Sequence, residues 1–298
     1  MTGSAIKNSE NQMEAGNIDL AVAMRLEALK INRAIGSRMG VANDFGRLAA
    51  LYILQGDLDR AEKMLTQAID IDQSLGRNDN MARHCAELAR LHLSRGDLQQ
   101  AEKLYRQSID LDLATGRRQK AAENYRDLAK IMEDRGDLEE AENLLLELVG
   151  IEESRFGEKA LAEALGRLAA VRLRRGIPAQ AEKVLEKAEH LYRELEDAGG
   201  LAETLGHLGI VYSAQDRPDQ AEFALTAALQ INIDTGRKAH QADNYANLAN
   251  LYWSQGYARE ARACYAEALS LFKETGHSAK ARKVLELLDG LQASHPNQ

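Results

Sequence analysis

The chain has 298 residues, a net charge of −8 and an apolar fraction of 45%. It contains only 3 Pro, and 5% of its residues are aromatic, while Ala, Leu, Glu and Arg are abundant. This composition predicts an all-α chain, because straight-chain residues lose little rotamer freedom in a helix. The negative charge argues against a nucleic-acid partner, because it repels the phosphate backbone. Two cysteines, Cys85 and Cys264, are too few for a disulfide framework or a zinc site.

The first residues, Met1 to Glu14, are polar and lack the apolar run of a secretory signal. The longest apolar cluster, Leu144 to Ile151, is interrupted by Glu147, so we expect no membrane insertion. A cytoplasmic location is the default expectation. Because the chain enters its first repeat almost at once, a removed leader or anchor stays an alternative.

A repeat of about 40 residues governs the whole sequence. The junctions are GNIDLA at Gly16, GDLDRAE at Gly56, GDLQQAE at Gly96, GDLEEAE at Gly136, GIPAQAE at Gly176, DRPDQAE at Asp216 and GYAREAR at Gly256. The junction Gly supplies the left-handed turn after one helix, and Asn17, Asp57, Asp97 and Asp137 can cap the next helix. We therefore predict a single domain over 1–298 with about seven repeats, whose second helices start near 17, 57, 97, 137, 177, 217 and 257.

Each repeat is predicted to contain two helices, here called helix A and helix B. In the second repeat, helix A is expected from Met39 to Gln55 and helix B from Leu58 to Leu75. Pro178 and Pro218 fall at the first position of a helix B, where the missing amide hydrogen costs nothing. Small residues recur at fixed positions in both helices, which lets neighbouring helices approach closely: Ala42, Ala82, Ala122, Ala162, Ala202 and Ala242; Ala49, Ala89, Ala129, Ala169, Gly209 and Ala249; and Ala21, Ala61, Ala101, Ala141, Ala181, Ala221 and Ala261.

The segment Leu48 to Glu62 reads Leu-Ala-x-x-Tyr-x-x-x-Gly-Asp-x-x-x-Ala-Glu, and this pattern resembles the tetratricopeptide repeat (TPR). The repeats of that family usually have 34 residues, and the longer ones here are similar to those of kinesin light chains, bacterial peptide-sensing regulators and cell-polarity adaptors. The resemblance covers almost the whole chain. It implies a right-handed α-solenoid of antiparallel helix pairs that binds proteins and does not catalyse reactions.

The ends and two junctions depart from the repeat. The first helix A, about Ala5 to Ala15, lacks the Leu and Tyr of its siblings. The turn at Gly157 comes one residue late, and the Gly199–Gly200 pair is expected to end the fifth helix B late. A capping helix is expected over 279–291, followed by a disordered tail over 292–298.

The resemblance implies that helix A surfaces line a concave groove, which makes their outward residues the candidate binding site. The partner-binding candidates are Arg47, Arg83, Arg90, Arg126, Lys130, Arg167, His207, Asn247, Asn250 and Trp253. The basic members suit an acidic peptide, because Arg pairs with carboxylates in a bidentate manner. The alternative is that neighbouring acids such as Glu87 and Asp127 neutralise them. Trp253 is either an interface residue or packs near Leu271.

No nucleophile, base or metal constellation is evident, so we expect no enzyme activity, no catalytic residue, no metal and no cofactor. His84 and Cys85 are adjacent and point to different helix faces, which argues against a metal pair. The pairs Asp70-x-Asp72 and Asp110-x-Asp112 are expected to pair with the basic residues after the helix B turns and not to bind calcium. The leading hypothesis is an adaptor that holds a peptide or helix of a partner. The alternatives are a regulatory sensor module of a larger protein and a self-assembling homo-oligomeric scaffold.

Overall fold

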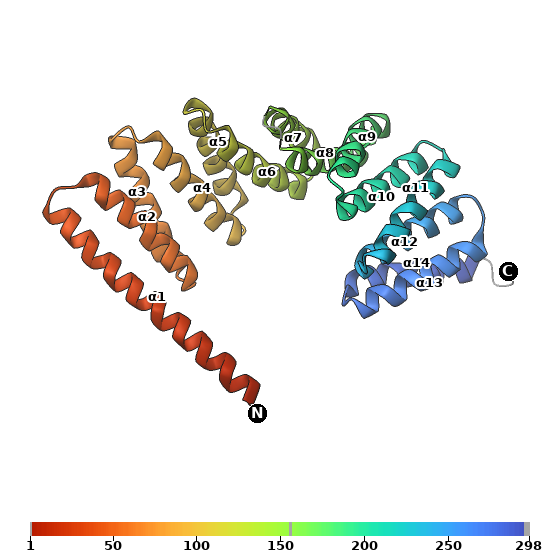
Figure 1. Ribbon diagram of the computed structural model, residues 1–298, viewed down its shortest axis with the longest axis horizontal. Helices are drawn as coiled ribbons and strands as arrows, with labels where there is room; N and C mark the ends of the chain where they lie inside the picture. The colour runs from red at the N-terminus through yellow and green to blue at the C-terminus, as the bar shows by residue number, and fades with distance from the viewer. Residues whose placement is uncertain (1, 155–156, 295–298) are drawn as a thin grey trace. The chain divides into compact units, whose positions relative to one another are not determined.

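A computed structural model describes residues 2–154 and 157–294, and within these ranges the chain forms fourteen α-helices and no strand (Figure 1). After α1 (Thr2–Ala34), helices A and B alternate. Helices A are α2 (Arg38–Leu54), α4 (Asn78–Ser94), α6 (Arg118–Arg135), α8 (Glu158–Arg174), α10 (Ala198–Ala214), α12 (Lys238–Ser254) and α14 (Ser278–Ser294). Helices B are α3 (Leu58–Ser74), α5 (Leu98–Ala114), α7 (Leu138–Glu153), α9 (Pro178–Glu194), α11 (Pro218–Asp234) and α13 (Ala258–Glu274).

The helices divide into two compact units, unit 1 (Met1–Arg135) and unit 2 (Gly136–Gln298). Within each unit, consecutive helices pack against one another, as in α2 with α3 or α10 with α11. The predicted all-α solenoid of antiparallel helix pairs is therefore confirmed. In unit 2, α10 also contacts the neighbouring helices A, α8 and α12, which places the helices A next to one another along one side.

The turns from helix A to helix B form at junction glycines, as predicted from the repeat. Gly56 has a φ of +76°, and the Asp57 carboxylate accepts a hydrogen bond from the amide of Arg60 at the start of α3. Two turns use other residues in the left-handed conformation, Glu196 (φ 52°) and Asp216 (φ 58°). The expected late end of the fifth helix B is therefore wrong, because Glu196 forms the turn and the Gly199–Gly200 pair lies inside α10.

Gly200 has a packing function in α10. A Cβ atom at Gly200 would lie 2.1 Å from the ring of Tyr192, so only Gly allows this close approach. Gly157 is the N-cap of α8, as Asp197 is of α10 one repeat later, so no residue is inserted there. The prediction that the Gly157 turn comes late is therefore wrong as well.

The N-terminal end differs from the expected repeat. Instead of a short helix A, a turn at Gly16 and a helix B from residue 17, α1 runs without a break from Thr2 to Ala34 (Figure 1). The segment Ala5 to Ala15 lacks the Leu and Tyr with which a helix A packs on its helix B, so helical hydrogen bonding continues through Gly16. The first helix pair is therefore absent.

The C-terminal helix also differs in extent. The predicted capping helix over 279–291 corresponds to α14, which continues to Ser294, so residues 292–294 of the expected tail are helical. Residues 295–298 lie outside the described residues.

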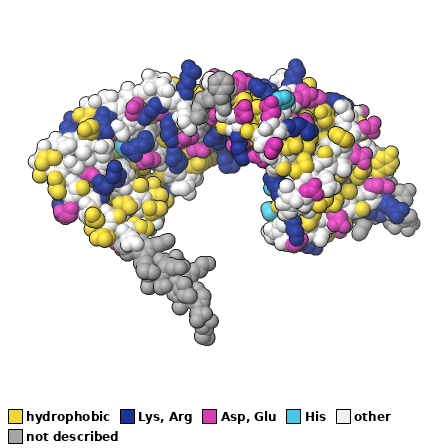
Figure 2. Space-filling model, in the orientation of Figure 1, with side chains coloured by type: hydrophobic (Ala, Val, Ile, Leu, Met, Phe, Trp, Pro, Cys, Tyr) yellow, Lys and Arg dark blue, Asp and Glu magenta, His cyan; other side chains and the backbone are white. Residues whose placement is uncertain are grey.

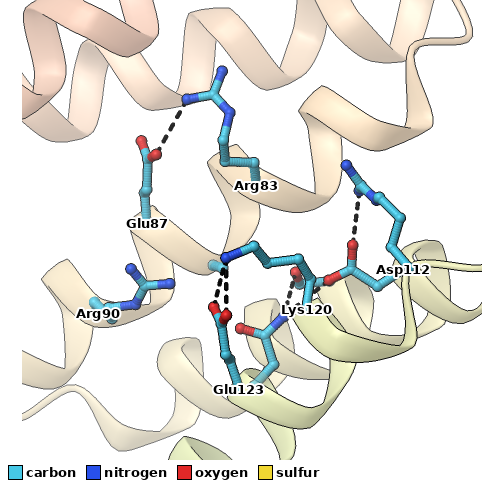
Figure 3. A pocket seen from close by; sticks show the side chains of 10 residues that line it. Arg83, Glu87, Arg90, Asp112, Lys120 and Glu123 are labelled. Carbon is cyan, nitrogen blue, oxygen red and sulfur yellow. Dashed lines mark hydrogen bonds and ion pairs between the residues drawn. The ribbon is translucent and has the colours of Figure 1, made fainter. Parts of the chain in front are cut away.

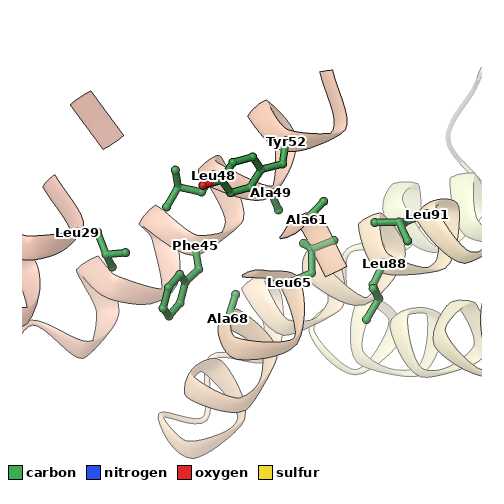
Figure 4. Packing of buried hydrophobic residues seen from close by; sticks show 10 residues of the cluster. All are labelled: Leu29, Phe45, Leu48, Ala49, Tyr52, Ala61, Leu65, Ala68, Leu88 and Leu91. Carbon is green, nitrogen blue, oxygen red and sulfur yellow. The ribbon is translucent and has the colours of Figure 1, made fainter. Parts of the chain in front are cut away.

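The core lies between helices A and B along the small-residue rows. In unit 1 it contains Leu48, Ala49, Tyr52, Ala61 and Leu65, all buried (Figure 4). In unit 2, Gly209 of α10 lies in the same small-residue row as Ala49, and a Cβ atom there would lie 2.4 Å from Leu225 Cγ of α11. Close approach of the two backbones at this row explains why it holds only Ala or Gly.

Candidate functional site

A row of polar side chains, buried except for the half-buried Asn32, connects α1, α3 and α5 of unit 1 to the helix A that follows each of them. Asn32 donates to Asp44 at 2.7 Å, and one repeat later His84 Nδ1 lies 2.9 Å from Asp72 Oδ2. Another repeat on, Asn124 donates to Asp112 at 3.1 Å. This row was not predicted, although the sequence has polar residues at the same positions of successive helices on an otherwise apolar helix face. These contacts fix the spacing between successive repeats and hold the helices that they join in place.

The pair Asp72 and His84 is sealed from solvent. Burial, together with the positive charges of Arg83 and Arg77, lowers the pKa of His84 to about 3, so the ring is neutral. Arg83 Nη2 lies 2.9 Å from His84 Nε2, so the neutral ring carries its proton on Nδ1, the nitrogen that lies 2.9 Å from Asp72 Oδ2. Burial also raises the pKa of Asp72, against the opposing effect of Arg77. With no exposed face, this pair has a structural function.

Asp72 and Asp112 pair with the basic residues after their turns, as predicted. The Arg77 guanidinium lies 3.1 Å from the Asp72 carboxylate, and the Arg117 guanidinium lies 2.7 Å from that of Asp112. In the part of the chain that the structure describes, no group of three His, Cys, Asp or Glu side chains is arranged to hold a metal ion. Burial raises the pKa of Cys85 to about 12, which keeps it a thiol.

A pocket of about 240 Å³ opens above the third buried pair, between α4, α5 and α6 of unit 1. Its floor is the buried set Ser108, Asp112 and Asn124. Asn124 Nδ2 donates to Ser108 Oγ at 2.9 Å, and Ser108 in turn donates to the backbone carbonyl of Ala82 at 2.8 Å. Because these bonds hold the floor side chains in place, the floor is pre-organised.

The rim of the pocket is charged, and its residues are exposed or half-buried. Its members are Arg83, Glu87 and Arg90 on α4, Arg117 in the turn after α5, and Lys120 and Glu123 on α6. Figure 3 shows that the charged side chains of α4 and α6 face each other across the opening. Four cations and two anions make the rim basic on balance, although the whole chain is acidic.

Arg83, Lys120 and Arg90 hold acidic neighbours through partly exposed contacts, whereas Arg117 holds the buried Asp112. Arg83 lies 3.2 Å from Glu87, Lys120 lies 2.9 Å from Glu123, and Arg90 Nε lies 3.9 Å from Asp127. Burial raises the pKa of Glu87, an effect that Arg83 opposes. Exposed pairs of this kind contribute little, so a ligand carboxylate can replace one partner at small cost.

The ten candidate residues are divided equally between the two units. In unit 1, Arg83 and Arg90 both line the pocket, whereas Arg47 is exposed between α1 and α2. Arg126 is half-buried, and the exposed Lys130 lies 3.7 Å from Asp134. Sequence reasoning missed Arg117 and Lys120, because they lie before and at the start of α6 and not on the outward row.

In unit 2, two of the five candidates, Asn250 and Trp253, are exposed. Arg167, His207 and Asn247 are half-buried, and burial lowers the pKa of His207. Asn250 is exposed and accepts a hydrogen bond from the Tyr265 hydroxyl, while Trp253 is 37% exposed. The candidate functional site is therefore the α4–α6 pocket.

Comparison with known families agrees with this architecture. The profile of the MalT-like TPR region matches residues 8–151 and, in a second alignment, residues 46–198. The chain belongs to the MalT-like TPR family. The profile of the soluble NSF attachment protein, SNAP, matches residues 169–297 of this TPR protein. No curated protein matches the sequence.

Solved structures share the fold of this MalT-like TPR protein at low sequence identity. BtubC (BKLC) from P. vanneervenii is 21% identical, with a TM-score of 0.58 over 74% of this chain and 92% of that chain. The C-terminal part of a TPR repeat-containing protein from Cytophaga hutchinsonii is 13% identical, with a TM-score of 0.60 over 89% and 94%. The pilF protein of Pseudomonas aeruginosa is 18% identical, with a TM-score of 0.53 over 84% and 98%.

These comparisons establish the coarse function of the chain. It is a TPR-type scaffold for protein interaction or regulation, and proteins of this kind are generally not enzymes. No described helix combines the length and the apolar character that crossing a membrane would need.

Proposed function

We propose that this TPR protein is an adaptor that binds a peptide or helix of a partner protein on its helix A surfaces, with an acidic side chain of the partner in the α4–α6 pocket. The observation that carries this proposal is the basic rim of Arg83, Arg90, Arg117 and Lys120 above a fixed polar floor. A carboxylate entering the pocket meets Arg83, Arg90 and Lys120, whose present partners are partly exposed, beside the Asp112 carboxylate that Arg117 holds.

The shape of the site favours a side chain over a whole small molecule. A volume of about 240 Å³ is below the usual range for drug-sized ligands, which is roughly 300–1,000 Å³. The Ser108 and Asn124 groups of the floor are polar and already hydrogen-bonded, so they add orientation more than apolar affinity. The peptide backbone would then run along the exposed faces of α4 and α6.

The other candidate residues extend the proposed surface within each unit. In unit 1, Arg47, Arg126 and Lys130 would take further acidic residues of the same partner. In unit 2, we propose that Arg167, His207, Asn247, Asn250 and Trp253 form a second contact surface, with Trp253 as its apolar anchor. We expect no nucleic-acid partner, in keeping with the net charge of −8. We also expect no catalysis and, by default, a cytoplasmic location.

Selection from a displayed library of random peptides tests this function. The wild-type protein should enrich peptides with Asp or Glu at fixed spacing, whereas an Arg83→Glu/Arg90→Glu variant should not. Lys103→Glu, on an exposed site of α5 outside the pocket, is the matched charge control and should enrich the same peptides as the wild type. Equal enrichment by the double variant would move the binding site away from the pocket.

The alternative is a regulatory sensor module, which would bind the peptide in the same pocket. It requires that peptide binding changes the activity of a further domain of a larger protein. Comparing the activity of such a domain with and without the selected acidic peptide separates the sensor from a passive adaptor.

A further inference from the structure

Arg83 is held at the rim of the α4–α6 pocket by two different kinds of partner. Its Nη1 lies 3.2 Å from the carboxylate of Glu87, and its Nη2 lies 2.9 Å from Nε2 of His84. Its contact with Asn80 is longer, at 3.5 Å. The two ends of the guanidinium are therefore fixed separately, one by an acid and the other by an imidazole ring.

The two partners differ in how easily a ligand can replace them. The Glu87 side chain is 25% exposed and lines the pocket, whereas His84 is completely buried. A carboxylate that enters the pocket can reach Nη1 of Arg83 by displacing Glu87, but it cannot reach the buried ring. His84 would therefore keep its hydrogen bond to Nη2 while the other end of the guanidinium changes partner.

The ring holds Arg83 without neutralising its charge. Burial and the positive charges of Arg83 and Arg77 lower the pKa of His84 to about 3, so the ring accepts a hydrogen bond and carries no charge. Figure 2 shows Lys and Arg side chains interspersed with Asp and Glu side chains over the visible face of unit 1, and such neighbours offset one another. A neutral partner leaves more of the Arg83 charge for a ligand than a carboxylate would.

The position of the ring is fixed by the preceding repeat. On α3, the Asp72 carboxylate lies 2.9 Å from His84 Nδ1, and Arg77 lies 3.1 Å from the same carboxylate. On α2, a Cβ atom at Gly46 would lie 2.4 Å from His84 Nε2, so the α2 backbone passes directly beside the nitrogen that binds Arg83. Contacts made by α2 and α3 thus determine where the guanidinium lies.

Arg83 and His84 occur together in one repeat only. The row of Arg83 has no other Arg in the helices A, and the row of His84 has no other His. The first row otherwise holds Asn43, Glu123, Glu163, Glu203, Asp243 and Lys283, and the second holds Asp44, Asn124, Ala164, Thr204, Asn244 and Val284. The one Arg of its row therefore has a buried acceptor as its neighbour.

We propose that His84 is a positioning residue of the α4–α6 pocket, which holds the guanidinium of Arg83 in place while a carboxylate of the partner replaces Glu87. This role rests on the proposed peptide binding and deepens it, because recognition then depends on a residue that the ligand does not touch. Since His84 acts through Arg83, its contribution to binding should vanish when Arg83 is absent.

NMR of the arginine side chains tests the positioning in the free protein. The Nη2 group of Arg83, assigned by its loss in Arg83→Met, should show restricted rotation in the wild type. His84→Phe keeps a buried ring but lacks the acceptor, so this restriction should disappear, while circular dichroism confirms that the helices are retained. Restricted rotation that persists in His84→Phe would overturn the inference.

Gly46→Ala is a second variant that keeps the imidazole. Its added methyl group displaces His84 Nε2, so it too should release Nη2 of Arg83. Gly166→Ala is the matched control, because Gly166 occupies the same row in α8 and has nothing within 4 Å of an added Cβ atom. This control should leave the Arg83 signal unchanged.

Calorimetric titration with a selected acidic peptide tests the consequence for binding. His84→Phe and Gly46→Ala should each weaken binding about fivefold, the effect of losing roughly one hydrogen bond, and Gly166→Ala should not. In an Arg83→Met background, His84→Phe should cause no further loss. An equal loss with and without Arg83, or no loss at all, would overturn the role of His84. An Arg83→Met variant that binds like the wild type would instead refute the proposed function, and the NMR result would still decide whether His84 holds Arg83.

Discussion

Asn124 on α6 donates a hydrogen bond to the carboxylate of Asp112 on α5 at 3.1 Å, and each of the two residues is only 2% exposed. The same pair forms the floor of the proposed binding pocket. The contact that fixes two neighbouring repeats therefore also fixes the surface that would meet a ligand.

Asn124→Ala should destabilise the protein. The substitution removes the amide that donates to both Asp112 and Ser108 and leaves Asp112 with Arg117, and the loss of these buried hydrogen bonds costs about 1–3 kcal/mol. The free energy of unfolding in urea measures the effect. Asn78→Ala, at an exposed site of α4, is the control and should change it by less than about 0.5 kcal/mol. Equal effects at both sites would argue against a buried network.

The stability of the protein should fall in mild acid because of His84. Its pKa is about 3 in the folded state and about 6.5 when unfolded, so between these values the unfolded chain binds more protons. Stability therefore decreases as pH falls through this window, by roughly 2 kcal/mol from pH 7 to pH 5 for this group. The raised pKa of Asp72 acts in the opposite direction over part of the window.

Comparison with His84→Gln isolates this effect, since the amide does not titrate. The variant should be less stable at pH 7, and its free energy of unfolding should change less between pH 7 and pH 5 than that of the wild type. An identical pH dependence of the two proteins would show that His84 is not held neutral by burial.

Gly209→Ala should destabilise unit 2. The added methyl group would lie 2.4 Å from Leu225 Cγ and 3.3 Å from the backbone carbonyl oxygen of Ala221, so α10 and α11 must move apart. Overpacking of this kind costs about 1–3 kcal/mol. Thermal unfolding measures it.

Gly166→Ala is the matched control, because Gly166 lies inside helix α8 with nothing within 4 Å of an added Cβ atom. Alanine favours a helix over glycine by about 1 kcal/mol, so this variant should be slightly more stable than the wild type. Stabilisation by both substitutions would contradict the close packing at Gly209.

Much of the fold could be predicted from the sequence because its turns are determined locally. Gly56 adopts the left-handed conformation and Asp57 caps the next helix, and both properties belong to the residues themselves. Glu196 could not be identified in this way, since a non-glycine residue adopts the left-handed conformation only when its surroundings impose it.

The continuous first helix shows the limit of turn signals. Gly16 and Asn17 resemble Gly56 and Asp57, yet α1 passes through them without a turn. A turn forms only when the helix before it has apolar residues to pack against the helix after it, and Ala5 to Ala15 lacks them.

The site was only partly predictable for a related reason. Arg83 and Arg90 followed from helical spacing, because both lie on one face of a single helix. Lys120 reaches the same pocket from α6, and the buried pair of Asp72 and His84 joins two helices. Such neighbours depend on how one repeat is placed on the next, which residue spacing within one helix does not determine.

Calorimetric titration with an acidic peptide from the library selection tests the binding function most directly. The wild-type protein should bind it, and replacing its acidic residues by Gln and Asn should weaken binding about tenfold or more, since hydrogen bonds to charged groups contribute about 1.5–3 kcal/mol each. Lys120→Glu should weaken binding of the acidic peptide, and Lys103→Glu should not. Equal affinity of the wild type for the acidic and neutral peptides, or full binding by Lys120→Glu, would contradict recognition of a carboxylate in the α4–α6 pocket.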